Sequence, residues 1–186
     1  MNLKFIPNLI CIMRMVLVAP IVMLLVRGEF ENALLLFFVA GFSDGLDGFL
    51  ARRFDWRTRL GGILDPLADK LLMFSVYITL TYVGLNPLWL ALVVIGRDLL
   101  IVGGGFAYNF LVKPVEGEPS GVSKINTGIQ LLYVLAVLSA AAYPALVPGW
   151  TVLFLGSLVL VTTVTSGIDY AWRWGMRAYR VSHEPT

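Results

Sequence analysis

Six mostly apolar runs, each about 20 residues long and separated by short turns, limit what this chain can fold into. Overall, 58% of the residues are hydrophobic and 14% are charged, which is the balance of an integral membrane protein rather than a soluble domain. The expected spans are roughly residues 7–27, 31–52, 61–83, 87–111, 124–143 and 150–172. The sequence therefore predicts an all-α integral membrane protein with six transmembrane helices, organised as a single membrane domain over residues 1–186.

The positions of lysine and arginine predict the orientation of these spans, because cytoplasmic loops carry an excess of both. The cationic residues lie between the second and third spans, between the fourth and fifth, and after the sixth, whereas the opposite side has only Arg27. We therefore expect both termini and the stretch of residues 43–70 to face the cytoplasm. The N-terminal residues do not resemble a cleaved signal or a transit peptide, and a bacterial inner membrane is the simplest location.

Acidic side chains gather in one stretch, residues 43–70, of this otherwise apolar chain. If the second span is helical, Asp44, Asp47, Gly48, Ala51 and Arg52 fall within an arc of roughly 140° on one helix face. These residues then share one side of that helix.

The third span continues the pattern. Gly61, Asp65 and Asp69 follow one another at intervals of four, which stacks them along a single ridge. Two helices can therefore present two carboxylates each to a shared space, with glycines allowing a close approach to the backbone.

Four aspartates beside a hydrocarbon layer require a counter-ion, since each costs about 2.5–3.5 kcal/mol near a membrane centre. Carboxylate oxygens select hard divalent cations such as Mg²⁺, Mn²⁺ or Ca²⁺, and the absence of nearby histidine or cysteine argues against zinc. Two metals flanking a phosphate form a recurrent arrangement for displacement at phosphorus. The stretch is therefore a candidate metal-dependent active site.

The pattern D-x2-D-G-x2-A-R-x8-G-x3-D-x3-D, from Asp44 to Asp69, resembles the signature of the CDP-alcohol phosphatidyltransferases, with every fixed position filled. The resemblance implies transfer of a phosphatidyl group from CDP-diacylglycerol to an alcohol, with release of CMP. It also implies that Asp44, Asp47, Asp65 and Asp69 hold two Mg²⁺ or Mn²⁺ ions, and that Asp69 is the catalytic base for the incoming hydroxyl.

The same resemblance assigns residues to the CDP-lipid. Gly48, Ala51 and Gly61 would leave room for the cytidine nucleotide, Arg52 would pair with its phosphate, and Asn8 matches a position near the cytidine. A homodimer is expected on the same grounds.

The chain also resembles the CMP-forming cardiolipin synthases of the eukaryotic type over about residues 6–140. The segments that carry this resemblance are IPNLICIMR (6–14), DPLADK (65–70), GRD (96–98) and SKINT (123–127). The phosphatidylglycerophosphate synthases share much of this pattern. Asn126 stands where the latter commonly have a lysine that could meet a phosphomonoester. This difference favours phosphatidylglycerol as the acceptor, giving cardiolipin. Glycerol 3-phosphate, giving phosphatidylglycerophosphate, stays open.

Three cations are candidates for binding the acceptor phosphate: Arg97, Lys124 and Arg14. Each has an alternative reading. Arg97 can form a structural ion pair with Asp98, Lys124 can be a simple cytoplasmic-side charge, and Arg14 can snorkel towards the interface.

A small cation channel or transporter is the alternative from another class, because acidic residues on helix faces also line ion paths. Such a protein would not require the glycines and alanine at these offsets, and Arg52 beside the carboxylates would repel a cation. A nucleic-acid partner is not expected, since no basic aromatic surface is present.

Overall fold

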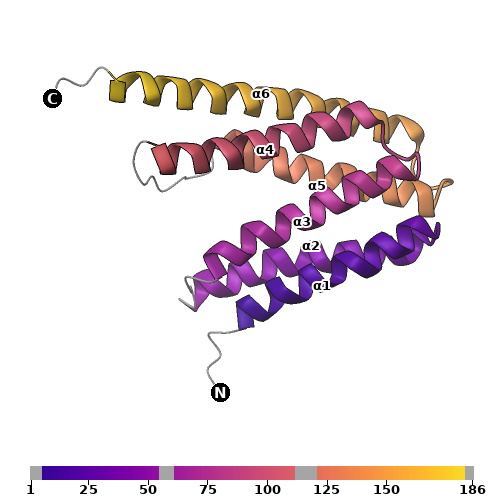
Figure 1. Cartoon of the computed structure of the whole chain (residues 1–186). Coiled ribbons are helices and arrows are strands. Elements are labelled where there is room, and N and C mark those ends of the chain that lie inside the picture. Colours follow the sequence, from indigo (N-terminus) through magenta and orange to yellow (C-terminus); the bar gives the residue numbers. More distant parts are fainter. Residues whose placement is uncertain (1–5, 55–60, 112–120, 183–186) are drawn as a thin grey trace. The chain divides into compact units, whose positions relative to one another are not determined.

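The computed structural model describes residues 6–54, 61–111 and 121–182, and within them the side chains of 6–8, 44–53, 61–65, 105–111 and 174–182 lie outside the description. These ranges form six helices, coloured along the chain in Figure 1. Their bounds are α1 Ile6–Val26, α2 Phe30–Arg53, α3 Gly61–Tyr82, α4 Leu88–Leu111, α5 Gly121–Ala142 and α6 Gly149–Ser182.

The six predicted helices are confirmed, and two of their ends differ from the expectation by more than one residue. Helix α5 begins at Gly121 rather than 124, and α6 continues to Ser182, ten residues past the predicted 172. An ion pair spans the predicted end of this helix, because Arg173 Nε donates to Asp169 Oδ1 at 2.8 Å, one turn earlier. Hydropathy predicts where an apolar run ends, which need not be where its helix ends.

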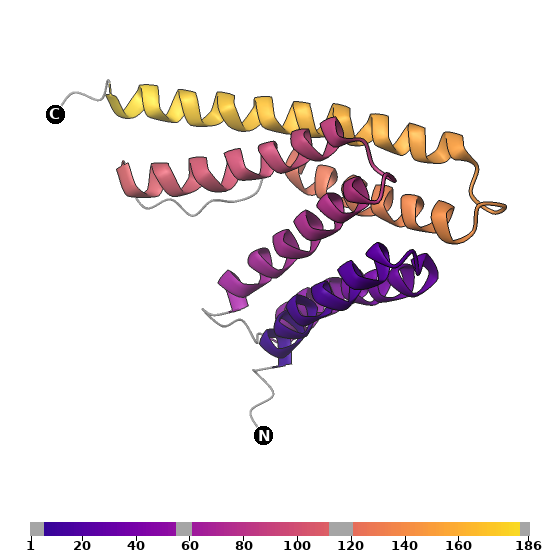
Figure 2. The same cartoon turned by 45° about the vertical axis from the view of Figure 1, so that its right-hand side comes forward.

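The helices belong to two compact units. The first unit contains α1, α2 and α3 together with Val134–Val152, which is the end of α5 and the start of α6. Helix α1 packs against both α2 and α3, and Figures 1 and 2 show α1 and α2 side by side. Apolar side chains from all three helices fill its core, among them Ile21, Leu25, Phe37, Val76 and Leu80. The aspartate stretch thus lies on two helices that share one packing partner.

The second unit contains α4, the part of α5 up to Tyr133 and the part of α6 from Leu153. Buried apolar residues such as Leu90, Val94 and Val159 contribute to it, but many of its buried side chains are polar.

Glycines at positive φ end α1 and α3. Gly28 has φ 74° and Gly84 has φ 79°. At the first of these turns, the Gly28 amide donates to the Leu25 carbonyl and the Glu29 amide donates to the Leu24 carbonyl. The same pair of bonds recurs at Gly84, and this Schellman arrangement satisfies the last carbonyls of each helix.

Three helices of the described residues are long and apolar enough to cross a membrane. Their apolar segments are Leu9–Val26, Gly121–Ala142 and Gly149–Arg173, with mean hydropathies of 2.7, 1.6 and 1.9. Trp150 and Trp172, at the two ends of the last segment, are exposed, as expected for residues of an aromatic belt. The chain is therefore a multi-pass membrane protein.

Replacing Gly84 with alanine should destabilise the protein by about 1–2 kcal/mol, because an L-residue at this φ brings its Cβ close to the following carbonyl. An added Cβ meets nothing else within 4 Å, so the cost is one of backbone conformation alone. Gly128→Ala is the matched control, since Gly128 is an exposed residue within α5 that also has space for a Cβ. Thermal unfolding in detergent should show a lower midpoint for Gly84→Ala and an unchanged or higher one for Gly128→Ala. Equal midpoints would contradict the role of Gly84.

Candidate active site

The backbone of the aspartate stretch is helical where the sequence requires it to be. Helix α2 extends through Asp44 and Asp47 to Arg53, and α3 begins at Gly61 and includes Asp65 and Asp69. The predicted spacings on the two helices therefore apply. Of the four carboxylates, that of Asp69 is partly buried, and the other three belong to side chains outside the description.

The donor set of this stretch fits a hard divalent metal. The four signature carboxylates belong to two helices that both pack against α1, a fifth aspartate, Asp55, lies between them in the sequence, and the stretch contains no histidine or cysteine. Among the described side chains, no three acidic, histidine or cysteine residues come together as a metal site. That search leaves out Asp44, Asp47 and Asp65, so the metal assignment stays a prediction.

The residues predicted for the CDP-lipid also lie on helices of the first unit. Asn8 is in the first turn of α1, and Gly48, Ala51 and Arg52 occupy the last turns of α2. Gly61 is the first residue of α3. Their side chains belong to the undescribed set, so their contacts with a nucleotide remain a prediction.

Arg14 lies inside the first unit, which removes the snorkelling alternative. Its side chain is only 1% exposed and is among the largest fully buried side chains of the described residues. A guanidinium buried to this degree needs compensating charge or hydrogen bonds. Because α1 packs against α2 and α3, Arg14 is buried within the unit that carries the four aspartates.

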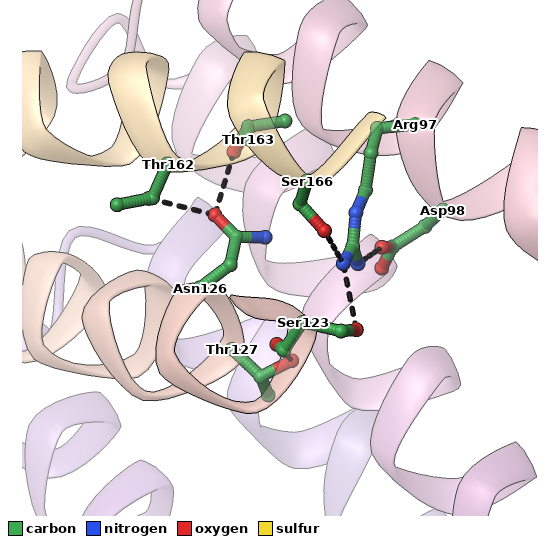
Figure 3. A network of polar contacts seen from close by, with 8 residues as sticks. All are labelled: Arg97, Asp98, Ser123, Asn126, Thr127, Thr162, Thr163 and Ser166. Carbon is green, nitrogen blue, oxygen red and sulfur yellow. Dashed lines mark hydrogen bonds and ion pairs between the residues drawn. The ribbon is translucent and has the colours of Figure 1, made fainter. Parts of the chain in front are cut away.

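Arg97 is the centre of a polar cluster in the second unit (Figure 3). Its Nη1 donates to Asp98 Oδ1 at 2.5 Å, and the two side chains are 4% and 1% exposed. Its Nη2 donates to Ser123 Oγ of α5 at 2.7 Å and also to Ser166 Oγ of α6. The Tyr170 ring centroid lies 5.9 Å from the guanidinium carbon, within range of a cation–π contact. The structural ion pair considered above is therefore present.

Asn126 forms a second polar layer, one turn further along α5. Its side chain is fully buried, and its Oδ1 accepts hydrogen bonds from Thr162 Oγ1 at 2.8 Å and Thr163 Oγ1 at 2.9 Å. Figure 3 shows the amide directed at α6. A side chain committed to a neighbouring helix says little about the charge of a substrate, so Asn126 no longer distinguishes the two acceptors.

The third candidate cation, Lys124, is exposed on α5, next to Ser123. Ser123 and Asn126 lie in SKINTGIQ, residues 123–130, which is a polar segment within a predicted apolar span. Their partners on α6 were missed. The run TTVTSG, residues 162–167, carries the signal that could have found them, because four hydroxyl side chains in one apolar helix indicate a polar contact with another helix.

The family profile described as CDP-alcohol phosphatidyltransferase matches residues 4–165. The chain therefore belongs to the CDP-alcohol phosphatidyltransferase family, and the resemblance noted in its sequence is confirmed.

Individual relatives fall into two groups. The probable CMP-forming cardiolipin synthase of Drosophila melanogaster is 36% identical over 91% of this chain and 57% of its own length. The CMP-forming cardiolipin synthase of Homo sapiens is 34% identical over 74% of this chain and 51% of its own length. The CDP-diacylglycerol–glycerol-3-phosphate 3-phosphatidyltransferase of Aquifex aeolicus is 35% identical over 71% of this chain and 74% of its own length. The chain thus spans little more than half of the two cardiolipin synthases.

Replacing Asp98 with alanine should destabilise the protein by about 3–5 kcal/mol, because the Arg97 guanidinium stays buried after losing its carboxylate. Asp169→Ala is the matched control, since it breaks a second Arg–Asp pair whose side chains, Arg173 and Asp169, are 56% and 25% exposed. An exposed pair of this kind contributes about 0.3–0.5 kcal/mol. Denaturant unfolding in detergent should separate the two variants clearly. Similar small losses would show that the buried pair is dispensable.

Proposed function

We propose that this chain transfers the phosphatidyl group of CDP-diacylglycerol to phosphatidylglycerol, forming cardiolipin and releasing CMP. The observation that carries the proposal is the placement of all eight signature positions, Asp44 to Asp69, on α2 and α3 at the spacing of this family. The names of the Drosophila and human relatives support phosphatidylglycerol as the acceptor.

Glycerol 3-phosphate is the second candidate acceptor. The Aquifex relative, whose name states that acceptor, is as similar to this chain as the cardiolipin synthases and is covered over more of its length. In that case the product would be phosphatidylglycerophosphate.

The proposal includes a membrane arrangement. All six helices cross the bilayer as one domain over residues 1–186, with both termini and the aspartate stretch on the cytoplasmic side. The three described apolar segments and the distribution of arginine and lysine support this topology. A bacterial inner membrane and a homodimer belong to the same proposal.

Asp44, Asp47, Asp65 and Asp69 would hold two divalent ions, Mg²⁺ or Mn²⁺, as their oxygen-only chemistry suits. When bound, such ions withdraw charge from the phosphate oxygens around the attacked phosphorus. Neighbouring residues would position the CDP-lipid. Arg52 pairs with a phosphate of the nucleotide, Gly48, Ala51 and Gly61 leave space beside it, and Asn8 contacts the cytidine.

Asp69 acts as the general base of the reaction. Its carboxylate accepts the proton of the acceptor hydroxyl, whose oxygen forms a bond to the phosphorus that carries diacylglycerol. The bond from that phosphorus to the bridging oxygen breaks, and the electron pair leaves with CMP. The partial burial of Asp69 keeps the base close to the protein interior rather than in open water.

Arg97 and Lys124 would bind the phosphate of the acceptor, and Arg14 is kept as a third candidate. Two of the donor nitrogens of Arg97 are taken by Asp98, Ser123 and Ser166, but its Nε is buried with no hydrogen-bond partner in the described residues. A phosphate oxygen would satisfy this donor. Because Asp98 neutralises Arg97, Lys124 supplies the net positive charge, which suits the single charge of a phosphodiester.

The direct test measures CMP release by the purified protein from CDP-diacylglycerol with Mg²⁺ or Mn²⁺. Parallel reactions contain phosphatidylglycerol or glycerol 3-phosphate. We expect release with phosphatidylglycerol, and release only with glycerol 3-phosphate would assign the chain to the second reaction. Metal flux across proteoliposomes without any CMP release would instead support a cation channel or transporter.

Asp69→Asn should lower turnover by about 10²–10⁴-fold, because an amide does not accept the proton. Asp44→Asn and Asp65→Asn should abolish metal-dependent turnover while the protein remains membrane-inserted, and chelation with EDTA should do the same reversibly. Asp169→Asn is the control, since Asp169 is an aspartate outside the signature. Near-normal turnover of Asp69→Asn would remove the base from that residue.

A further inference from the structure

Helices α5 and α6 meet in the second unit along a regular antiparallel seam. At one end, Ser123 Oγ and Ser166 Oγ both accept hydrogen bonds from Nη2 of Arg97. Three residues further along α5, Asn126 meets Thr163, which lies three residues back along α6. At the other end, a Cβ added to Gly156 would lie 3.2 Å from Tyr133 Cε2. For each residue further along α5, the partner lies one residue earlier in α6, so a single antiparallel register accounts for all three contacts.

The middle of this seam is where the register is specified. Apolar side chains pack against one another in several registers at similar energy, whereas an amide that must meet two hydroxyls has one solution. Asn126 Oδ1 accepts from both Thr162 and Thr163, and its side chain has no exposed surface. This bridge is the polar contact of the seam nearest to the Arg97 layer (Figure 3).

A change in the register of α5 and α6 would break the hydrogen bonds that Arg97 donates to these two helices. Moving α6 by one turn displaces it by about 5.4 Å along its axis, which is beyond hydrogen-bond reach. Ser123 and Ser166 would then no longer meet the same guanidinium nitrogen. The orientation of Arg97 thus depends on a contact one turn away.

We propose that Asn126 is a positioning residue, which sets the register of α5 and α6 through Thr162 and Thr163 and thereby holds Arg97 for the acceptor phosphate. The inference rests on the proposed function in one respect, namely that Arg97 meets the acceptor. The register itself is independent of that function, and the experiments below separate the two.

The kinetic test compares the KM for the acceptor with the KM for CDP-diacylglycerol. Asn126→Leu removes the amide at similar size, and Thr163→Val removes one hydroxyl with little change of shape. Each variant should raise the acceptor KM about fivefold or more and leave the KM for CDP-diacylglycerol within twofold. Thr165→Val is the matched control, because the exposed Thr165 hydroxyl bonds only to the Val161 carbonyl of its own helix. Equal increases in both KM values would overturn the proposal.

A partner swap tests the contact rather than the residue. Asn126→Thr combined with Thr163→Asn places the amide on α6 and the hydroxyl on α5. The double variant should recover most of the acceptor KM lost in the two single variants. Additive losses would show that the contact does not set the register.

Disulfide cross-linking tests the register of α5 against α6 without any measurement of activity. In a Cys11→Ala background, which removes the one native cysteine, Gln130→Cys and Val159→Cys occupy positions that the seam places opposite each other. Mild oxidation should link them efficiently in the otherwise unchanged protein and poorly once Asn126→Leu is added. Unchanged linking would overturn the register role. Lost linking with an acceptor KM that neither Asn126→Leu nor Arg97→Ala alters would keep the register role and remove Arg97 from the acceptor site.

Discussion

Hydrocarbon offers no hydrogen bonds, so a polar group buried between these helices is stabilised by partners inside the protein. The second unit shows how this requirement organises packing. Arg97 meets Asp98 on its own helix and one serine from each of two others, so a single guanidinium ties three helices together. Asn126 does the same for two helices through a pair of threonines. In the first unit, the burial of Arg14 places the same demand on the helices around it. Polar matching, more than apolar contact, makes these arrangements specific.

The two ways of reading Arg97, as a structural ion pair or as a phosphate-binding group, are not exclusive. The pair with Asp98 and the two serines occupy Nη1 and Nη2, which orients the guanidinium plane in advance. Its Nε is a buried donor without a hydrogen-bond partner in the described residues. A cation fixed in this way loses little side-chain entropy when an anion arrives, which favours selective binding over strong binding. Structural stability and recognition can therefore rely on the same side chain.

Much of the fold follows from the sequence alone, because apolar runs of membrane length and glycine turns such as that at Gly28 are local signals. The eight signature positions are local too, and they lie on two helices. What the sequence does not contain is the rotation of one helix against another. In the sequence, Asn126 is interpreted as the replacement of a lysine that would bind substrate. Only the packing shows that its side chain accepts hydrogen bonds from Thr162 and Thr163. The serine of α6 that meets Arg97 lies 69 residues away in the chain, beyond any local pattern.

The length of α6 has a geometric consequence. Its 34 residues rise about 51 Å, which exceeds the roughly 40–45 Å of a whole bilayer with its headgroups. Even standing upright, this helix reaches into water, and its exposed Arg173 marks the transition out of the apolar segment. The last turns of α6 continue the same helix that contacts Asn126 of α5 and carries Ser166. The turns beyond Arg173 and the residue Ser166, which contacts Arg97, therefore belong to one uninterrupted helix.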